Sequence, residues 1–211
     1  MSKLESVLVG LFIGITCPLL IFVGFWWSAA LLHRYLPDFP LQFVIASAVT
    51  GLCVGMILDV LFLKNWVPRF YTTNIWLMGI IYIALSIAAV AFFMGLPVGT
   101  IILGILAGIY MGRRACHAQI DLTMDESSLR KTSLAAGAVT SMAAFPIGLL
   151  ALNEDDILEM LQSLLGIWQL NFRGWAGFTL IGLLCIFLYL IQYWLSKQVG
   201  YLAYHAGKRI A

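Results

Sequence analysis

Long apolar runs alternate with short polar connections along this chain. Six such runs cover residues 6–32, 41–63, 74–95, 97–116, 131–152 and 174–196. Each is long enough to cross a bilayer, because a helix needs about 20 apolar residues to span roughly 30 Å of hydrocarbon. Residues 70–112 carry no charge, yet the sequence MGLPVG at 94–99 divides them into two lengths that each fit a bilayer. The pattern predicts an all-α integral membrane protein with six transmembrane helices.

The composition favours a single polytopic membrane domain over residues 1–211. The chain is 62% hydrophobic and only 10% charged, whereas a soluble domain has about 25% charged residues. Most of the chain therefore faces the lipid bilayer or other helices. The first run resembles a signal peptide in its position, but its apolar stretch is about twice the length of a typical signal core. We therefore expect it to be retained as a span.

The distribution of positive charge predicts the orientation. Ten of the 12 Lys and Arg residues fall on one side of the expected bilayer, and Arg34 and Arg173 fall on the other. Because cytoplasmic loops carry the Lys and Arg excess, both termini are expected to be cytoplasmic. The net charge of +2 then reflects topology, and no nucleic-acid partner is expected.

The external segment between the fifth and sixth spans is predicted to form a separate element. Asn153 precedes three acidic residues, 154–156, which suit the positive end of a helix dipole. Apolar residues recur at helical spacing after them, so we expect an amphipathic interfacial helix over 154–168 on the outer surface. It would serve as a connector that shields the bundle or as a lid over an external vestibule.

Small residues recur at every fourth position in several runs. In lipid there is little hydrophobic force between helices, so such positions let two backbones approach closely. We expect the second, fourth and fifth spans to form the core, with the second and fourth meeting through their glycine faces. The bulky sixth span is expected at the periphery, against lipid. The predicted helix-packing positions are Gly51, Gly55, Gly104, Gly108, Gly112 and Gly137.

Asp59 is the acidic side chain predicted within a span, on the same face as Gly51 and Gly55. A charge at membrane depth costs about 2.5 kcal/mol or more, so it usually pairs or marks a pathway. Three interpretations remain open. Asp59 forms a structural ion pair with Arg113 or Arg114, or it is an ion- or proton-coupled site, or it lies exposed to water near the membrane surface.

The sequence offers no pattern for a bound cofactor or metal. The four cysteines are scattered singly without a C-x-x-C pair, and the three histidines fall at or outside the ends of the spans. We therefore expect no cofactor, no metal and no catalytic residue. An enzyme that works from loop residues at the membrane interface is the alternative.

Two functions fit this pattern. A transport unit, as a carrier, channel or solute-binding permease subunit, is favoured by spans interrupted at Pro18 and Pro146. Its solute would be small and neutral or apolar, or a cation. A non-catalytic scaffold or anchor of a larger membrane complex is the alternative. Either is expected to form a homo-oligomer or to join other membrane subunits. The pathway candidates are Thr16, Ser47, Asp59, Thr100, Thr140, Ser141 and Gln192.

Overall fold

The computed structural model describes residues 3–36, 40–92, 97–119, 126–151 and 175–210. Its elements are α1 (Lys3–Tyr35), α2 (Leu41–Arg69), the short 3-10 helix η1 (Phe70–Thr72), α3 (Ile75–Phe92), α4 (Val98–His117), α5 (Ser127–Ala151) and α7 (Trp175–Ile210). Six of these helices are long and apolar enough to cross a membrane. The all-helical class and the six candidate spans are thus confirmed, as expected for a multi-pass membrane protein.

Three parts of the predicted topology stay predictions. The interfacial helix expected at 154–168 lies outside the described residues. The cytoplasmic position of both termini and the single membrane domain also remain expectations. Within the described part of the chain, the helices form two compact units, Met1–Ala88 (unit 1) and Ala89–Ala211 (unit 2).

Two helices continue well past the predicted ends of their spans. The second span is α2, which ends at Arg69 rather than at 63, and the sixth is α7, which ends at Ile210 rather than at 196. The apolar pattern stops at Lys64 and Lys197, but backbone hydrogen bonding does not depend on an apolar side chain. At 36 residues, α7 is about 54 Å long, which exceeds the roughly 30 Å of hydrocarbon in a bilayer. A helix of this length crosses such a layer either strongly tilted or with one end beyond the hydrocarbon.

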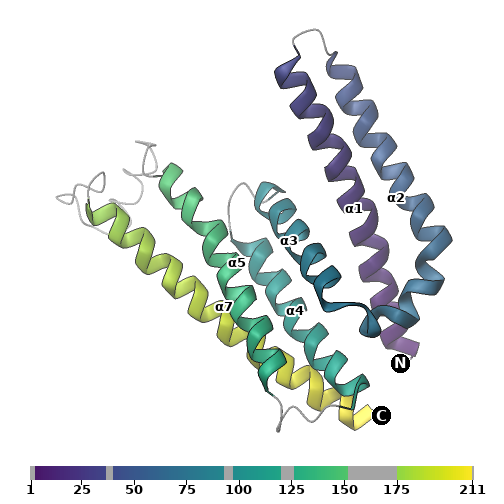
Figure 1. Ribbon diagram of the computed structural model, residues 1–211, viewed down its shortest axis with the longest axis vertical. Coiled ribbons are helices and arrows are strands. Elements are labelled where there is room, and N and C mark those ends of the chain that lie inside the picture. Colours follow the sequence, from purple (N-terminus) through teal and green to yellow (C-terminus); the bar gives the residue numbers. More distant parts are fainter. Residues whose placement is uncertain (1–2, 37–39, 93–96, 120–125, 152–174, 211) are drawn as a thin grey trace. The chain divides into compact units, whose positions relative to one another are not determined.

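Unit 1 contains an antiparallel hairpin of α1 and α2, which run side by side in Figure 1. Glycines of α2 lie at the closest approach. A Cβ at Gly51 would lie 2.7 Å from the Cβ of Phe25, and one at Gly55 would overlap Pro18. The hydroxyl of Ser47 donates to the carbonyl oxygen of Phe25 at 3.0 Å. The absence of side chains on one face of α2 is therefore what lets α1 approach.

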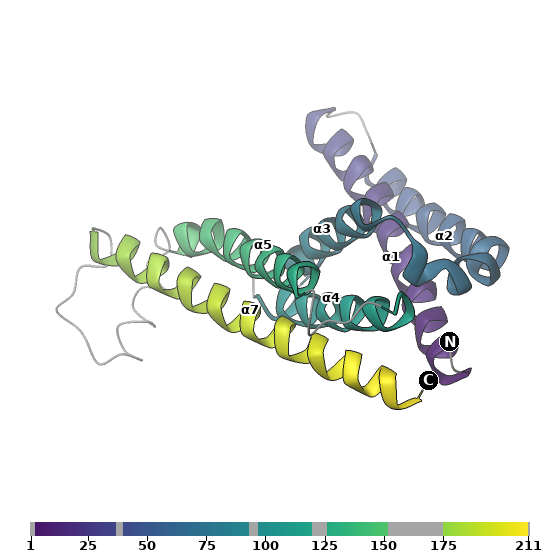
Figure 2. The ribbon, with the colours of Figure 1, turned by 60° about the horizontal axis from the view of Figure 1, so that its bottom comes forward.

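Unit 2 contains α4, α5 and α7, seen from two directions in Figures 1 and 2. The helices α4 and α7 are parallel, because Gly104, Gly108 and Gly112 face positions 192, 196 and 200 in the same order. The helix α5 runs antiparallel to α7, since Gly137 lies against Tyr189 and Gly148 against Ile181.

The predicted partners of the glycine faces are wrong. The face of α2 is filled by α1, and the face of α4 is filled by α7, so these two faces do not meet each other. The sixth span is not peripheral either, because α7 packs against both α4 and α5. Its small and polar residues also recur at every fourth position, at Gln192, Ser196 and Gly200, and the bulky residues between them hide this stripe in the sequence.

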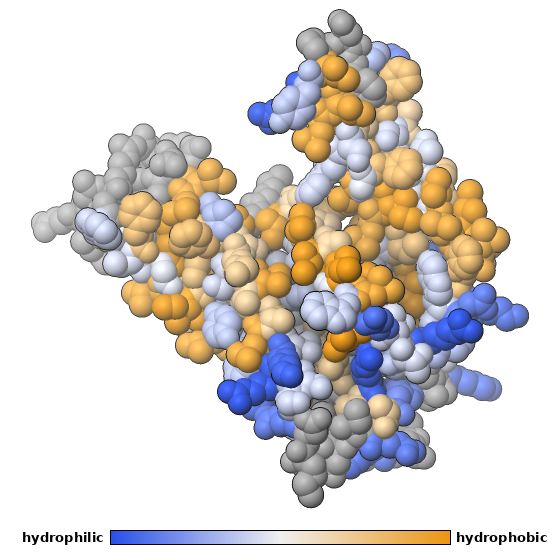
Figure 3. Space-filling model, viewed as in Figure 1, coloured by the Kyte–Doolittle hydropathy of each residue, from blue (hydrophilic) through white to orange (hydrophobic). Residues whose placement is uncertain are grey.

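The outward surfaces suit a lipid environment. The face drawn in Figure 3 is mainly hydrophobic along the helices of each unit, and hydrophilic residues gather near helix ends. Large apolar side chains such as Val60, Trp76 and Leu183 are more than half exposed. Exposure of so much apolar surface to water would be unfavourable, whereas such a surface is expected where helices contact lipid.

Two glycine-to-leucine substitutions test the packing in unit 2. A Cβ at Gly108 would overlap the carbonyl oxygen of Ser196, whereas one at Gly182 would have nothing within 4 Å. Gly108→Leu should therefore lower the free energy of unfolding by about 3 kcal/mol, because the obstacle is backbone that cannot rotate away. Gly182→Leu should change it by no more than about 1 kcal/mol. Thermal unfolding in detergent measures both, and equal melting temperatures would contradict the packing described.

Candidate functional site: a buried polar row between α4, α5 and α7

Unit 2 buries a row of polar side chains. Five of them have no exposed surface: Thr100 from α4, Ser133 and Thr140 from α5, and Gln192 and Ser196 from α7. A helix in lipid gains little from turning a hydroxyl or amide toward acyl chains, so these groups collect where helices face one another. Three of the predicted pathway residues, Thr100, Thr140 and Gln192, are thus brought into the same bundle.

Gln192 occupies the space that Gly104 leaves open. A Cβ at position 104 would overlap the side-chain nitrogen of Gln192 and would lie 3.4 Å from the Cβ of Ala136. The amide nitrogen Nε2 of Gln192 donates to the carbonyl oxygen of Ile101 at 3.4 Å. The lack of a side chain at Gly104 therefore leaves room for the Gln192 amide, which any larger residue at this position would displace.

Thr100 and Thr140 lie at one level of the bundle. Gly104 faces Ala136 across the antiparallel pair of α4 and α5, so the residues four positions further toward the same end are Thr100 and Thr140. The hydroxyl of Thr100 donates to the carbonyl oxygen of Pro97 at 2.8 Å, within its own helix start. The hydroxyl of Ser133 likewise donates to the carbonyl oxygen of Leu129 at 2.9 Å.

Three buried polar atoms of the row lack a hydrogen-bond partner among the described residues. They are Oγ1 of Thr140, Oε1 of Gln192 and Oγ of Ser196. Leaving a buried polar group unpaired costs about 1–3 kcal/mol, and buried polar groups in folded proteins are nearly always paired. Unit 2 thus buries three polar atoms that make no hydrogen bond to the described residues and could form one with a bound molecule.

The remaining pathway candidates lie elsewhere. Ser47 links α2 to α1 through its bond to Phe25, and Thr16 of α1 is half-buried. Ser141 of α5 is half-buried next to Thr140. The predicted helix breaks are not breaks in the structure, because α1 continues through Pro18 and α5 continues through Pro146. Pro18 is buried against Gly55, and Pro146 is exposed.

Asp59 is buried in unit 1, with 8% of its surface exposed. Cys17 of α1 hydrogen-bonds its carboxyl group, and Oδ1 has no partner among the described residues. Arg114 of unit 2 donates to the hydroxyl of Tyr110 at 2.9 Å, and a Cβ at Gly207 would lie 2.7 Å from Nη1 of Arg113. The proposed pair of Asp59 with Arg113 or Arg114 would join the two units and stays a prediction.

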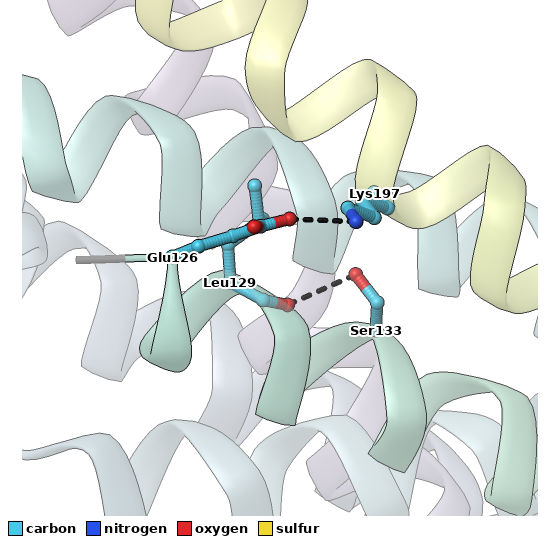
Figure 4. Close-up of polar contacts among 4 residues, drawn as sticks. All are labelled: Glu126, Leu129, Ser133 and Lys197. Atoms are coloured by element: carbon cyan, nitrogen blue, oxygen red, sulfur yellow. Dashed lines mark hydrogen bonds and ion pairs between the residues drawn. The ribbon is translucent and has the colours of Figure 1, made fainter. Parts of the chain in front are cut away.

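An ion pair joins α7 to the residue that precedes α5. The Lys197 ammonium lies 2.6 Å from Oε1 of Glu126, one turn from the Ser133–Leu129 bond (Figure 4). Hydrogen bonds from Lys197 and from the Tyr201 hydroxyl hold the pKa of the Glu126 carboxyl below its ordinary value. Beside this pair, Met111, Ala115, Leu129 and Tyr204 form an apolar cluster that closes this end of the bundle.

Metal binding finds no support in the described part of the chain, where no group of three or more His, Cys, Asp or Glu residues could hold an ion. Cys17, Cys53, Cys116 and Cys185 are all free thiols.

No known protein family, curated protein or solved structure matches this chain.

The sequence pattern did not predict three features as parts of a site: Ser196, Ser133 and the Glu126–Lys197 pair. Ser196 carries a usable signal, because it stands between Gln192 and Gly200 at helical spacing. Ser133 belongs to a stripe of small residues that is equally consistent with packing alone. The ion pair has no signal in the sequence, since its partners are more than 70 positions apart and meet only when α5 packs on α7.

The Glu126–Lys197 pair predicts a pH-dependent contribution to stability. Because the pKa of Glu126 is lowered in the folded state, its contribution is present above the ordinary glutamate pKa and is lost as the pH falls through the lowered value. Glu126→Gln should therefore reduce the melting temperature slightly at neutral pH and have no effect in acid. The control is Lys131→Gln, which removes an exposed charge. A difference between wild type and Glu126→Gln that persists unchanged into acid would rule the pair out.

Proposed function

We propose that this chain is a membrane transport unit that passes a small neutral, hydrogen-bonding solute along the polar row of α4, α5 and α7. The observation that carries the proposal is the set of three buried and unpartnered polar atoms on Thr140, Gln192 and Ser196. In hydrocarbon each unpaired group is expensive, so a row of them is expected where a passing solute supplies the missing partners.

The chemistry of the row favours a neutral solute. A threonine or serine hydroxyl both donates and accepts a hydrogen bond, and the free amide oxygen of Gln192 accepts. The five buried polar side chains of the row carry no charge, so nothing in it would compensate an ion removed from water. The apolar and cationic solutes that the sequence also allowed fit this row less well.

The spacing of the row suits stepwise movement. Gln192 and Ser196 are one turn apart on α7, which is about 5–6 Å along the axis. Thr140 lies one turn from Ala136, which contacts the same Gly104 as Gln192 does. Permeation requires binding that is weak and repeated rather than strong and single. Polar groups on successive turns, with apolar surface between them, provide such a series.

The wider setting is consistent with this function. Six candidate spans in 211 residues form a small transporter, so the proposal includes a homo-oligomer or additional membrane subunits, with both termini in the cytoplasm. The helix α5, which contributes Thr140, also contains Pro146. A proline inside a transmembrane helix leaves one backbone carbonyl without its helical donor, and such carbonyls can contribute to a transport site.

Substitutions that remove only the unpartnered groups provide the test. Thr140→Val and Ser196→Ala should each reduce solute flux at least about tenfold, equivalent to about 1.4 kcal/mol, measured by light scattering of proteoliposomes challenged with water, urea or glycerol gradients. The same variants should unfold at the same or a higher temperature, because replacing an unpaired buried polar group by an apolar one is neutral or stabilising.

The matched control is Thr179→Val. Thr179 is exposed on α7 and its hydroxyl is bonded to the carbonyl oxygen of Ala176 at 2.8 Å, so the substitution should leave flux unchanged. Flux no greater than that of empty liposomes for all three solutes would overturn the proposal. Co-purification of a larger complex in that case would favour the scaffold function.

A further inference from the structure

Asp59 carries an unpartnered buried atom in unit 1, which is separate from the polar row of unit 2. Its side chain is 8% exposed, and its Oδ1 atom has no hydrogen-bond partner among the described residues. It stands five residues before Lys64, which is about 7 Å along the axis of α2. The chain continues as helix to Arg69, so Asp59 lies inside the helix rather than at its end.

The turn of α1 that faces Asp59 contains Pro18, although the helix continues through it. A Cβ on Gly14 would lie 3.8 Å from Oδ2 of Asp59, and Pro18 packs on Gly55, one turn away on α2. Proline has no backbone N–H, so the Gly14 carbonyl lacks the donor that an uninterrupted helix would supply. The Asp59 carboxyl and a backbone carbonyl without its helical donor thus belong to facing turns of one hairpin.

The charged and titratable groups around Asp59 leave its charge uncompensated within unit 1. The elements packed most closely against α2 are α1 and η1. Towards the end of the hairpin that holds Asp59 they bring Lys3, Glu5, Cys17 and Tyr71, whereas His33, Arg34 and Tyr35 lie at the opposite end of α1. The helix α2 itself carries Cys53, Lys64 and Arg69. Of these groups, Cys17 is the one that hydrogen-bonds the carboxyl group. A thiol is a weak donor and carries no positive charge.

We propose that Asp59 and the facing turn of Gly14 to Pro18 form a proton-binding site. Burying a carboxylate without a nearby cation is unfavourable, and binding a proton removes its charge. The carboxylate takes up one proton from water at the Lys64 end of α2 and becomes a carboxylic acid, and the same proton returns on deprotonation. The acid also gains an O–H donor, for which the Gly14 carbonyl is an acceptor without a helical partner. This site is independent of the solute proposed for unit 2.

The experiment uses the full-length protein in proteoliposomes and dicyclohexylcarbodiimide, an apolar reagent that modifies protonated carboxyl groups. Mass spectrometry of peptides locates the modification. Asp59 should be modified, and the rate should fall about tenfold for each pH unit above its pKa, as the protonated fraction does. Asp59→Asn should abolish this modification, whereas Glu5→Gln should leave it intact. An infrared band of a protonated carboxylic acid, lost in Asp59→Asn, provides a second readout that does not depend on access of the reagent.

Ion replacement separates a proton site from a metal-cation site. Equal modification in sodium and in choline salts supports the proposal, and protection by sodium overturns it in favour of a sodium site. Absence of both the modification and the acid band at every pH also overturns it. That result is expected if Arg113 or Arg114 holds Asp59 as a carboxylate. A failure of solute flux in the unit 2 experiments would leave these measurements unaffected.

Discussion

Helices that meet in lipid are not driven together by the hydrophobic effect, because acyl chains are as apolar as leucine. Their association depends on how closely two backbones can approach, and therefore on positions without side chains. Glycine at such positions destabilises the isolated helix by about 1 kcal/mol. The close helix contact that it allows must therefore stabilise the fold by more than this. In unit 2 the carbonyl groups of Ser196 and Gly200 face Gly108 and Gly112 directly. The arrangement of α4 on α7 follows from this contact.

The same constraint determines where polar groups can lie. Close backbone contact leaves small notches, and a side chain from the partner helix can enter one of them. At Gly104 the entering group is the amide of Gln192, while at Gly55 it is the ring of Pro18. The first contact therefore places a hydrogen-bonding amide inside the bundle, and the second places a proline-containing turn of α1 against α2. Both units use glycine for packing, but the groups that enter differ in chemistry.

The helices could be predicted from the sequence because hydropathy and length act locally, and all six predicted spans begin within four residues of the observed helices. The sequence did not predict which helices pack together. A glycine stripe indicates that another helix approaches closely, but it does not identify that helix. The stripe of α4 fits the stripe of α7, but Trp194, Tyr193 and Leu195 stand between its members and give the segment a bulky average. The buried positions of Thr100, Thr140 and Gln192 were predictable as inward-facing polar residues. Their hydrogen-bonding state was not, since it depends on the register of three helices.

That hydrogen-bonding state is the ground on which we propose that some buried polar groups of this chain are functional and others structural. Ser47 and Ser196 are the same residue type, each on a small-residue stripe at a helix contact. The hydroxyl of Ser47 donates to Phe25 across the hairpin, so its bond holds α1 to α2 and its capacity is used. The hydroxyl of Ser196 has no such partner, although it is more deeply buried. A group that already forms a hydrogen bond within the fold is less available to a solute or a proton. A buried polar atom without a hydrogen bond destabilises the fold unless a solute or a proton binds to it. Four atoms belong to the second kind, and the proposed functions rest on them: Oγ1 of Thr140, Oε1 of Gln192, Oγ of Ser196 and Oδ1 of Asp59.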